Sequence, residues 1–360
     1  MKKISFGVDI GGINSAIGIV DRTGKIYCES VVSTKSYPYF DQYPNYVEAL
    51  AEAMRGLLSG LDFEYELMGI GIGAPNASSV RGTIEQPANL WKYRPVEGGE
   101  QRGVQGEERG CVQGVEQGEE RGCVQGVEQG EESARVFSLV EDLKRQFPQC
   151  ESVKITNDAN AATIGEMVFG AAQGMQDFAM VTLGTGLGSG FVANGEMIYG
   201  TEGFAGELGH ICAVHNGREC GCGLRGCIET YVSATGICRT AFELMATMRD
   251  KSVLRDIPFN KLDSLQIAQA AEAGDPIALE AFRYTAELLG RVLGTVVTIF
   301  TPEAIVLFGG LAKAGKILIE PTKLYMDRAT LPSQSGKTKL LASAIKGNVA
   351  IMGAAALILK

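Results

Sequence analysis

ISFGVDIGGINSAIGIVDRTGKIYCESVV, residues 4–32, alternates apolar runs with short polar turns. The apolar runs are expected strands, at 4–9, 16–20 and 26–32. Between the second and third runs, the polar segment 21–25 contains a glycine and has the composition of a hairpin connection. A helical pattern follows at 46–58, and a short buried strand follows at 68–73. This order of three strands, one helix and one strand predicts an α/β layer with a partly parallel sheet.

The rest of the chain continues to alternate helical and strand patterns, apart from one segment. Helical patterns are found at 136–147, 159–169, 232–254, 265–273, 276–300 and 348–359. Strand patterns are found at 152–156, 178–183, 190–192, 196–199 and 304–307. With 360 residues, 45% of them apolar, the chain can bury a sizeable core and is long enough for two domains.

The composition limits the kinds of partner that the protein is expected to bind and the cellular compartment in which it is expected. The 42 acidic residues outnumber the 33 basic ones, and a net charge of −9 argues against nucleic acid or an anionic membrane, which require clustered lysine and arginine. No uninterrupted run of 18 apolar residues occurs, so no membrane span is expected. The N-terminus lacks the pattern of a secretory leader, so we expect a cytoplasmic protein with reduced thiols. The nine cysteines are then core residues, reactive thiols or metal ligands.

Residues 94–134 differ from the rest of the chain. RGCVQGVEQGEE occurs twice in tandem, at 109–120 and 121–132, after a shorter relative at 102–108. Glycine recurs at every fourth position, which is unfavourable in a helix, and the apolar content is too low to offset the entropy of ordering. We expect a tandem-duplicated, mostly disordered surface loop, with a partner-binding or helical insertion as the alternative. Its ten glutamates and four arginines carry −6 of the net charge, so the remaining residues are nearly neutral.

Three glycine-rich turns follow expected strands. Asp9-Ile10-Gly11-Gly12 combines an acid that can hold hydrated Mg²⁺ with glycines whose N–H groups can approach an anion, although ordinary hairpin turns have the same composition. LGTGLGSG, residues 183–190, has four glycines and two hydroxyls, which makes a phosphate-binding loop plausible. The stretch 310–316 nearly matches a P-loop, but Ile317 replaces the hydroxyl residue, and a lone near match is usually coincidence. Together the turns indicate one nucleotide held between two α/β halves.

A compact set of thiols and one imidazole follows the second glycine loop. The set consists of His210, Cys220, Cys222 and Cys227. Its spacing is H-x9-C-x-C-x4-C, and three thiolates with one imidazole satisfy tetrahedral Zn²⁺ with no open position. The sequence therefore predicts a structural zinc site, with Cys212 and His215 as competing ligands. The alternative of cysteines in an apolar core is disfavoured because the neighbouring residues are Gly, Arg, Glu and Asn.

Isolated polar residues lie at the ends of expected elements. Asn157 and Asp158 follow the strand at 152–156, while Glu207 and Glu229 flank the zinc-ligand candidates. A carboxylate at the end of a buried strand can serve as a general base, and acids around a zinc loop can bind the vicinal hydroxyls of a polyol. A helix cap or a surface charge explains any one of them better, but their clustering around the zinc loop favours a polyol site.

The sequence resembles the ROK family of sugar kinases and repressors, which belongs to the actin-like ATPase superfamily. The motifs occur in the same order in that family. The matching pieces are 8–12, 157–161, 183–190, 203–210, 220–229 and 309–310. They span the chain apart from 94–134, and the pair ExGH and CxCGxxGCxE is highly specific.

The resemblance implies an α/β, two-domain actin-like ATPase (ribonuclease H-like) fold with a nucleotide/sugar cleft and a zinc-stabilised loop. By this resemblance, residues 1–161 with the C-terminal helix 346–360 form a small domain. Residues 162–345 form a large domain that includes the zinc loop 207–229. Family resemblance also favours a homodimer or homotetramer.

The same resemblance implies an ATP-dependent hexose kinase that uses Mg²⁺ and a structural Zn²⁺. Asp158 would be the general base that accepts the proton of the sugar 6-hydroxyl as it attacks the γ-phosphate. The residues that would hold the other hydroxyls are Asn157, Glu207, His210 and Glu229, with Asn89 as a weaker candidate. The residues that would hold the nucleotide are Asp9, Gly11, Gly12, Gly184, Thr185, Gly186, Gly309 and Gly310. His210 would bind both the sugar and, with Cys220, Cys222 and Cys227, the zinc ion.

The first phosphate loop departs from the family pattern at one position. Ile13 stands where the family usually has Thr, and Asn14 or Ser15 would substitute for the missing hydroxyl. The turn at 73–76 likewise ends in Asn where Gly is common.

We expect glucose as the acceptor and glucose 6-phosphate as the product. N-acetylglucosamine, mannose and fructose are alternatives, because the motifs are shared among kinases for these sugars. A sugar-responsive repressor of the same family is an alternative of another class, although the first expected strand begins by Ile4 and leaves no room for a DNA-binding module. A third alternative is a non-catalytic sugar-binding protein with a structural zinc.

Overall fold

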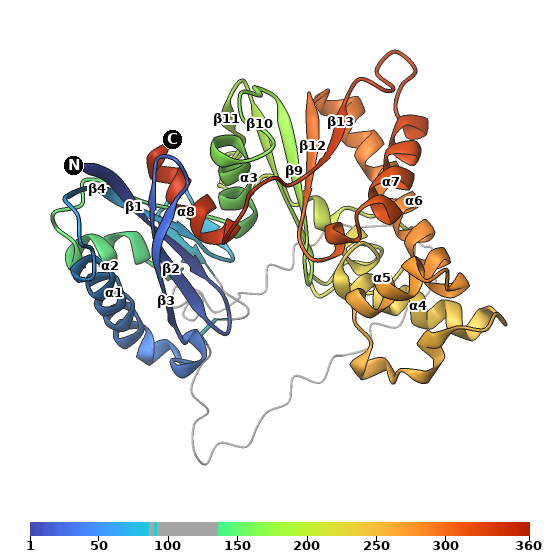
Figure 1. Cartoon of the computed structure of the whole chain (residues 1–360), viewed down its shortest axis with the longest axis horizontal. Coiled ribbons are helices and arrows are strands. Elements are labelled where there is room, and N and C mark those ends of the chain that lie inside the picture. Colours follow the sequence, from blue (N-terminus) through green and yellow to red (C-terminus); the bar gives the residue numbers. More distant parts are fainter. Residues whose placement is uncertain (86–89, 92–135) are drawn as a thin grey trace, which may run out of the picture.

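The computed structural model describes residues 1–85, 90–91 and 136–360. Two five-stranded sheets lie side by side, each with helices packed against it (Figure 1). The first sheet, in the order β3-β2-β1-β4-β8, forms the first lobe with α1, α2 and α8. The second sheet, in the order β11-β10-β9-β12-β13, forms the second lobe with α4 to α7. The α/β class and the resemblance-based fold are confirmed, whereas the domain boundaries remain a prediction.

The expected N-terminal strands form the first sheet. Its strands are β1 (Lys2–Ile10), β2 (Ser15–Asp21), β3 (Ile26–Val32), β4 (Tyr65–Gly73) and β8 (Val153–Thr156). The first three strands pair antiparallel, whereas β4 runs parallel to both β1 and β8. The prediction of a partly parallel sheet is therefore correct.

Alternate residues of β1 face different helices, as the period of a strand requires. The side chains of Phe6 and Val8 are buried in the core with α1 (Tyr43–Ser59) and α2 (Leu139–Gln146). On the other face, Gly7 lies under α8 (Val349–Leu359), where a Cβ would overlap the carbonyl of Ile351. Gly71 of β4 meets the carbonyl of Ala354 in the same way. The small-residue C-terminal helix thus returns to the N-terminal sheet.

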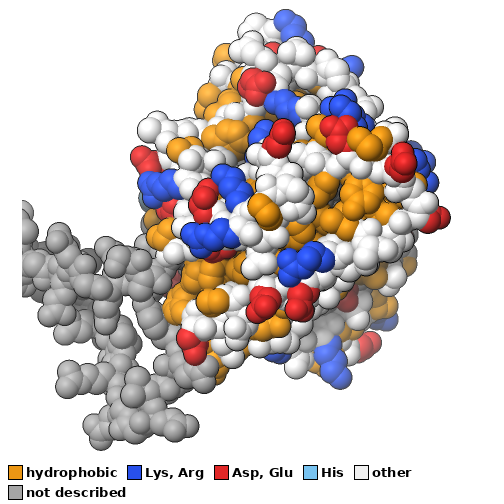
Figure 2. Space-filling model, turned by 90° about the vertical axis from the view of Figure 1, so that its left-hand side faces the viewer, with side chains coloured by type: hydrophobic (Ala, Val, Ile, Leu, Met, Phe, Trp, Pro, Cys, Tyr) orange, Lys and Arg blue, Asp and Glu red, His pale blue; other side chains and the backbone are white. Residues whose placement is uncertain are grey.

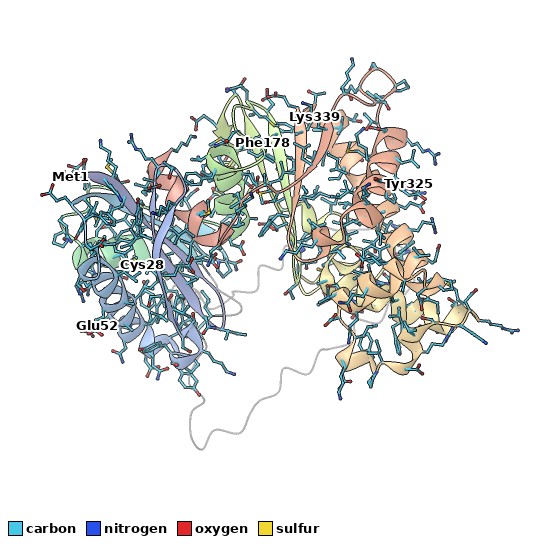
Figure 3. The ribbon with its side chains drawn as sticks, viewed as in Figure 1. Met1, Cys28, Glu52, Phe178, Tyr325 and Lys339 are labelled. Carbon is cyan, nitrogen blue, oxygen red and sulfur yellow. The ribbon has the colours of Figure 1, made fainter. Side chains whose placement is uncertain are left out.

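The second sheet is built around two parallel neighbours. Its strands are β9 (Phe178–Leu183), β10 (Leu187–Ala193), β11 (Glu196–Met197), β12 (Ala304–Phe308) and β13 (Lys339–Ala342). Strands β9, β12 and β13 are parallel, and β9, β10 and β11 are joined antiparallel. Phe178 at the start of β9 is buried with Ile164 of α3 (Asp158–Phe169), so α3 covers one face of this sheet (Figure 3).

The other face of the second sheet is covered by a helical layer. Its helices are α4 (Ala234–Thr247), α5 (Ser264–Glu272), α6 (Pro276–Phe300) and α7 (Lys316–Ala329). Single 3-10 turns connect the elements at Leu208–His210, Ile228–Thr230, Val253–Asp256, Phe259–Lys261 and Leu311–Ala314. Helices α6 and α7 approach closely because Gly290 faces Tyr325, where an added Cβ would lie 2.5 Å from the Tyr325 Cβ (Figure 3).

Three details differ from the sequence-based expectations. The helix expected at 136–147 begins later, because Val136–Phe137 is strand β7 and pairs with β6 (Thr83–Glu85), which also pairs with β5 (Ala77–Ser78). The helical pattern at 232–254 is divided into α4 and a separate 3-10 turn. Helix α7 and strand β13 were not expected. Asn89 and the repeat segment 94–134 lie outside the described residues.

The face of the first lobe shown in Figure 2 mixes acidic and basic side chains. Ion pairs in this lobe include Lys3 with Glu66 and Lys144 with Glu141. In the described part of the chain, every helix is too short or too polar to span a bilayer.

Candidate functional site

Parallel strands bring Asp9 and Asp158 to the same edge of the first sheet. Asp9 is paired with Gly73 of β4, and Gly73 is paired with Thr156 of β8. Asp158 follows Thr156 by two residues and begins α3. An added Cβ on Gly73 would lie 3.7 Å from the Asp158 Cα and 3.9 Å from the Asp9 Oδ1, so this glycine lies between the two acids. The carboxyl edge of a parallel sheet is the usual place for a ligand.

The carboxyl ends of β9 and β12 meet in the second lobe. Thr182 is paired with Phe308, so the two following glycine turns begin side by side. Gly309 has a φ of +107°, and a Cβ there would approach the backbone nitrogen of Leu183 to 3.0 Å. Only glycine fits this conformation and this close approach.

A cavity of 730 Å³, called cavity A here, lies between the two sheet edges. Its polar lining includes Asp9 from β1, Asp158 from the start of α3, Lys313 from the second lobe and Asn348 from the start of α8. Gly309 and Gly310 form part of the same wall. The helices α3 and α8 both begin at this cavity, and helix N-termini favour anions.

The two acids of cavity A have raised pKa values. Burial raises the pKa of Asp9 to about 6, and the charge of Asp158 adds to this effect. Burial also raises the pKa of Asp158, opposed by the backbone N–H of Ala159, which donates to Oδ1 at 2.8 Å. Two neighbouring carboxylates in a buried cavity favour a cation between or beside them, and carboxylate oxygens suit Mg²⁺.

A second cavity of 410 Å³, cavity B, adjoins cavity A. The two share Asp158, Ala159, Thr182, Phe308 and Gly309 in their linings. Cavity B also brings together the predicted sugar-binding residues Asn157, Glu207, His210 and Glu229. The Asn157 Oδ1 caps α3 by accepting from Ala159 N at 2.8 Å, so its amide NH₂ is the group that can donate into the cavity.

Glu207 and His210 lie on the same short turn in the wall of cavity B. Burial raises the pKa of Glu207, the charge of His210 opposes this, and the charges of Asp158 and Glu229 add to it. The His210 Nε2 lies 4.0 Å from the Glu207 Oε2. A hydroxyl placed among these groups meets donors and acceptors on several sides.

Glu229 links the second glycine loop to the cysteine loop. Its Oε2 accepts from the backbone nitrogen of Leu187 at 2.9 Å, and the Cys220 Sγ lies 3.8 Å from Oε1. A Cβ on Gly186 would overlap this carboxylate. The family resemblance assigned nucleotide binding to Gly184, Thr185 and Gly186. In the structure these residues line cavity B rather than cavity A.

Ser189 fixes the backbone on both sides of Glu207. Its buried hydroxyl donates to the carbonyl of Gly206 and accepts from the backbone nitrogen of Leu208 at 3.2 Å. The second hydroxyl of the glycine loop is thus occupied by the Glu207 turn. The sequence suggested that it would help to hold phosphate.

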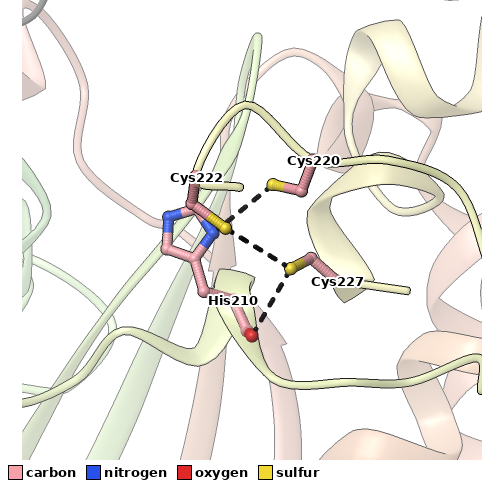
Figure 4. A group of neighbouring side chains, drawn as sticks. All are labelled: His210, Cys220, Cys222 and Cys227. Carbon is pink, nitrogen blue, oxygen red and sulfur yellow. Dashed lines mark hydrogen bonds between the residues drawn. The ribbon is translucent and has the colours of Figure 1, made fainter. Parts of the chain in front are cut away.

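The four predicted zinc ligands form one cluster (Figure 4). Their ligand atoms all lie within 4.8 Å of one another. Tetrahedral zinc with bonds of about 2.3 Å to sulfur and about 2.0 Å to nitrogen places sulfur atoms about 3.8 Å apart and sulfur about 3.5 Å from nitrogen. The Cys222 and Cys227 sulfurs are 3.7 Å apart, and the Cys220 Sγ is 3.6 Å from the His210 Nδ1. These residues therefore fit zinc, whereas Cys212 and His215 lie outside the cluster.

Arg218 anchors the cysteine loop to α4. Its guanidinium is buried, donates to the carbonyls of Thr230 and Gly236 at 2.6 and 3.2 Å, and pairs with Glu243 at 2.6 Å. The guanidinium also lies over the Tyr231 ring, 4.3 Å from its centroid. The guanidinium of one side chain thus ties the loop that carries the zinc cluster to α4.

Several cavity residues were missed in the sequence. Lys313 belongs to the stretch that was set aside as a near match to a P-loop, and Asn348 was assigned only to the C-terminal helix. The signal for Lys313 was present, because a lysine follows the paired glycines after a strand. No local pattern marks Asn348, which reaches cavity A only because α8 returns to the first sheet.

Other predicted contacts do not line either cavity. Gly11 and Gly12 are absent from the described linings of cavities A and B, and their roles remain predictions. Ser15 is fully buried, and its hydroxyl bonds with Thr34 and Tyr46 at 2.8 and 2.7 Å. Ser15 is therefore engaged in the core and does not replace the missing hydroxyl at exposed Ile13.

The sequence profile that defines the ROK family matches residues 127–360 of this chain. The chain belongs to the ROK family. This ROK chain is 29% identical over 352 residues to a glucokinase of Halalkalibacterium halodurans, covering 96% of the chain and 92% of that protein. It is 28% identical to a xylose repressor of Bacillus spizizenii over 208 residues, which are 58% of the chain and 50% of the repressor.

Among solved structures, the ROK chain is similar to a ROK family glucokinase from Streptomyces griseus in complex with glucose and AMPPNP. The sequence identity is 29%, the TM-score is 0.71, and the match covers 99% of each chain. The relatives thus include sugar kinases along their full length and a repressor over about half of its length.

Proposed function

We propose that this ROK protein transfers the γ-phosphoryl group of ATP to the 6-hydroxyl of a hexose, with glucose as the preferred acceptor. The observation that carries the proposal is the position of Asp158, which lines both cavity A and cavity B. A base at this shared wall can take a proton from a hydroxyl in cavity B while a phosphate occupies cavity A. The glucokinase relatives support the same reaction.

The other residues of cavity B have the chemistry to hold an acceptor. Asn157 offers an amide donor, Glu207 and Glu229 offer carboxylate acceptors, and His210 offers its Nε2. Groups built to pair with several hydroxyls discriminate between sugars, because each unmade hydrogen bond in a buried site is costly.

Cavity A has the chemistry to hold the donor. Asp9 is placed to hold Mg²⁺, either directly or through its water, and the turn at Gly309 and Gly310 leaves room for phosphate to approach the backbone. When bound, Mg²⁺ neutralises charge on the phosphate oxygens. Zinc would be held by His210 and the three cysteines and would fix the loop that carries them.

An assay of ADP release over a panel of hexoses tests the proposal. We expect turnover with glucose above that with mannose, fructose or N-acetylglucosamine, and a product phosphorylated at the 6-position by phosphorus NMR. Because repressors occur among the relatives, hexose binding alone does not suffice. Absence of turnover with every hexose would contradict the kinase assignment.

Ser189→Ala tests how the Glu207 turn is held. Two hydrogen bonds to the turn are lost, each worth about 1 kcal/mol, and Leu208 N is left without its partner. We expect the KM for the hexose to rise about fivefold while kcat changes less than twofold, measured by steady-state kinetics. Ser5→Ala is the matched control, because Ser5 is buried and donates to a backbone carbonyl, Gly69, in the first lobe. An equal KM for both variants would show that Ser189 does not position Glu207.

A further inference from the structure

Lys313 lies at the boundary between two cavities. It belongs to the 3-10 turn Leu311–Ala314, directly after the glycine pair at the end of β12. It lines cavity A, and it also lines a cavity of 360 Å³, cavity C, between this turn and α5. Cavities A and C share Gly310 and Lys313. Cavity A therefore adjoins cavity B at a junction that includes Asp158, and it adjoins cavity C at a junction that includes Lys313.

Acidic side chains outnumber basic ones in the linings of cavities A, B and C. Asp9 and Asp158 face cavity A, and both would repel a polyphosphate. Among the described residues that line cavities A, B and C, Lys313 is the only lysine or arginine. Within the described part of the chain, its ammonium has no ion pair, although Glu272 lies in the lining of cavity C. An ammonium without a carboxylate partner beside an acidic cavity can bind an anionic ligand.

We propose that Lys313 binds the phosphate chain of the nucleotide donor where that chain passes from cavity A toward cavity C. This inference rests on the proposed function, because it takes cavity A as the donor site. Lys313 lies at the junction with cavity C and Asp158 at the junction with cavity B, so Lys313 holds phosphates other than the transferred one. Its ammonium therefore contributes to nucleotide binding and leaves the transfer step unchanged, because an interaction that is equal in the ground state and the transition state changes KM and not kcat.

A ligand series tests the inference. With Mg²⁺ present, calorimetric titrations of ADP, AMP and adenosine are compared between the wild type and Lys313→Met. We expect the Kd of ADP to rise about tenfold, the Kd of AMP to rise less and the Kd of adenosine to stay within twofold. Lys313→Arg retains most of the ADP affinity, because the positive charge remains. In turnover assays, the KM for ATP rises in Lys313→Met while kcat and the KM for the hexose are unchanged.

Lys316→Met is the matched control. Lys316 is three residues further along the chain, its side chain is 90% exposed, and it lies 4.0 Å from Glu320, outside the cavity linings. Equal losses of ADP and adenosine affinity, or an unchanged Kd for ADP, would overturn the role of Lys313. Lys313-dependent ADP binding without hexose phosphorylation would overturn the proposed function and leave this inference standing. A wild type that binds no nucleotide would overturn both.

Discussion

Asp158→Asn is expected to lower kcat about a thousandfold while the KM for the hexose changes by less than threefold. The amide keeps the size of the side chain but cannot accept the proton of the attacking hydroxyl, and a positioned base contributes about a hundredfold to ten-thousandfold. The cap of α3 is preserved, because Asn157 rather than Asp158 is the capping residue. Steady-state kinetics with glucose and ATP measures the effect.

Asp177→Asn is the control for this substitution. Asp177 accepts from the backbone nitrogen of Asn194 at the opposite end of β9 from the cavities, so its loss tests folding without touching the site. An Asp158→Asn enzyme with more than a tenth of the wild-type kcat would exclude Asp158 as the base.

The pH dependence of the wild type provides a second test of the same base. Asp158 accepts a proton only when it is ionised, and burial raises its pKa above the ordinary value for an aspartate. Activity is therefore expected to be full above the pKa and to fall as pH decreases through it, with the acid limb of the kcat/KM profile above pH 3.8.

In the metal-free protein, Asp158→Asn should also lower the pKa of Asp9 below about 6, because one of the two causes of its rise is removed. Carbon NMR of the Asp9 carboxyl measures that shift.

The sequence could predict those parts of the site whose residues lie close together along the chain. The cysteines lie within one short loop, so their spacing indicated a zinc site, whereas the role of Asp158, which begins a helix just after a strand, came from the family resemblance and stays a prediction. The strand periods of β1 to β3 are equally local, and their bounds differ from the expected ones by only a few residues.

The features that were missed depend on tertiary packing. Helix α7 carries Pro321 inside it, which normally argues against a helix, and its packing against Gly290 and Gly294 of α6 outweighs that preference. Strand β13 has only four residues, none of them fully buried, and it forms because β12 offers a parallel edge. The place of Glu229 against Gly186 joins loops 43 residues apart, which no local pattern shows.

Cys227→Ser is expected to remove the zinc ion and thereby to weaken hexose binding. Cys227 is fully buried, and its sulfur lies 3.7 Å from that of Cys222 and 3.5 Å from the carbonyl oxygen of His210. Structural zinc sites contribute about 10 kcal/mol or more of apparent binding free energy, so the loop 207–229 should lose its fixed conformation. We expect less than 0.1 zinc per chain by elemental analysis, on the order of one zinc per chain in the wild type, and a Tm several degrees lower.

The hexose KM should rise at least tenfold in Cys227→Ser, because His210 connects the metal cluster to the acceptor cavity. Its Nδ1 faces Cys220 at 3.6 Å, whereas its Nε2 faces Glu207 at 4.0 Å, so a metal on Nδ1 orients Nε2 toward the acceptor. Cys212→Ser is the matched control, since Cys212 is exposed, lies in the same loop and is outside the cluster. It should keep its zinc and its KM. Zinc retained by Cys227→Ser but lost by Cys212→Ser would show that the loop binds metal through a different set of ligands.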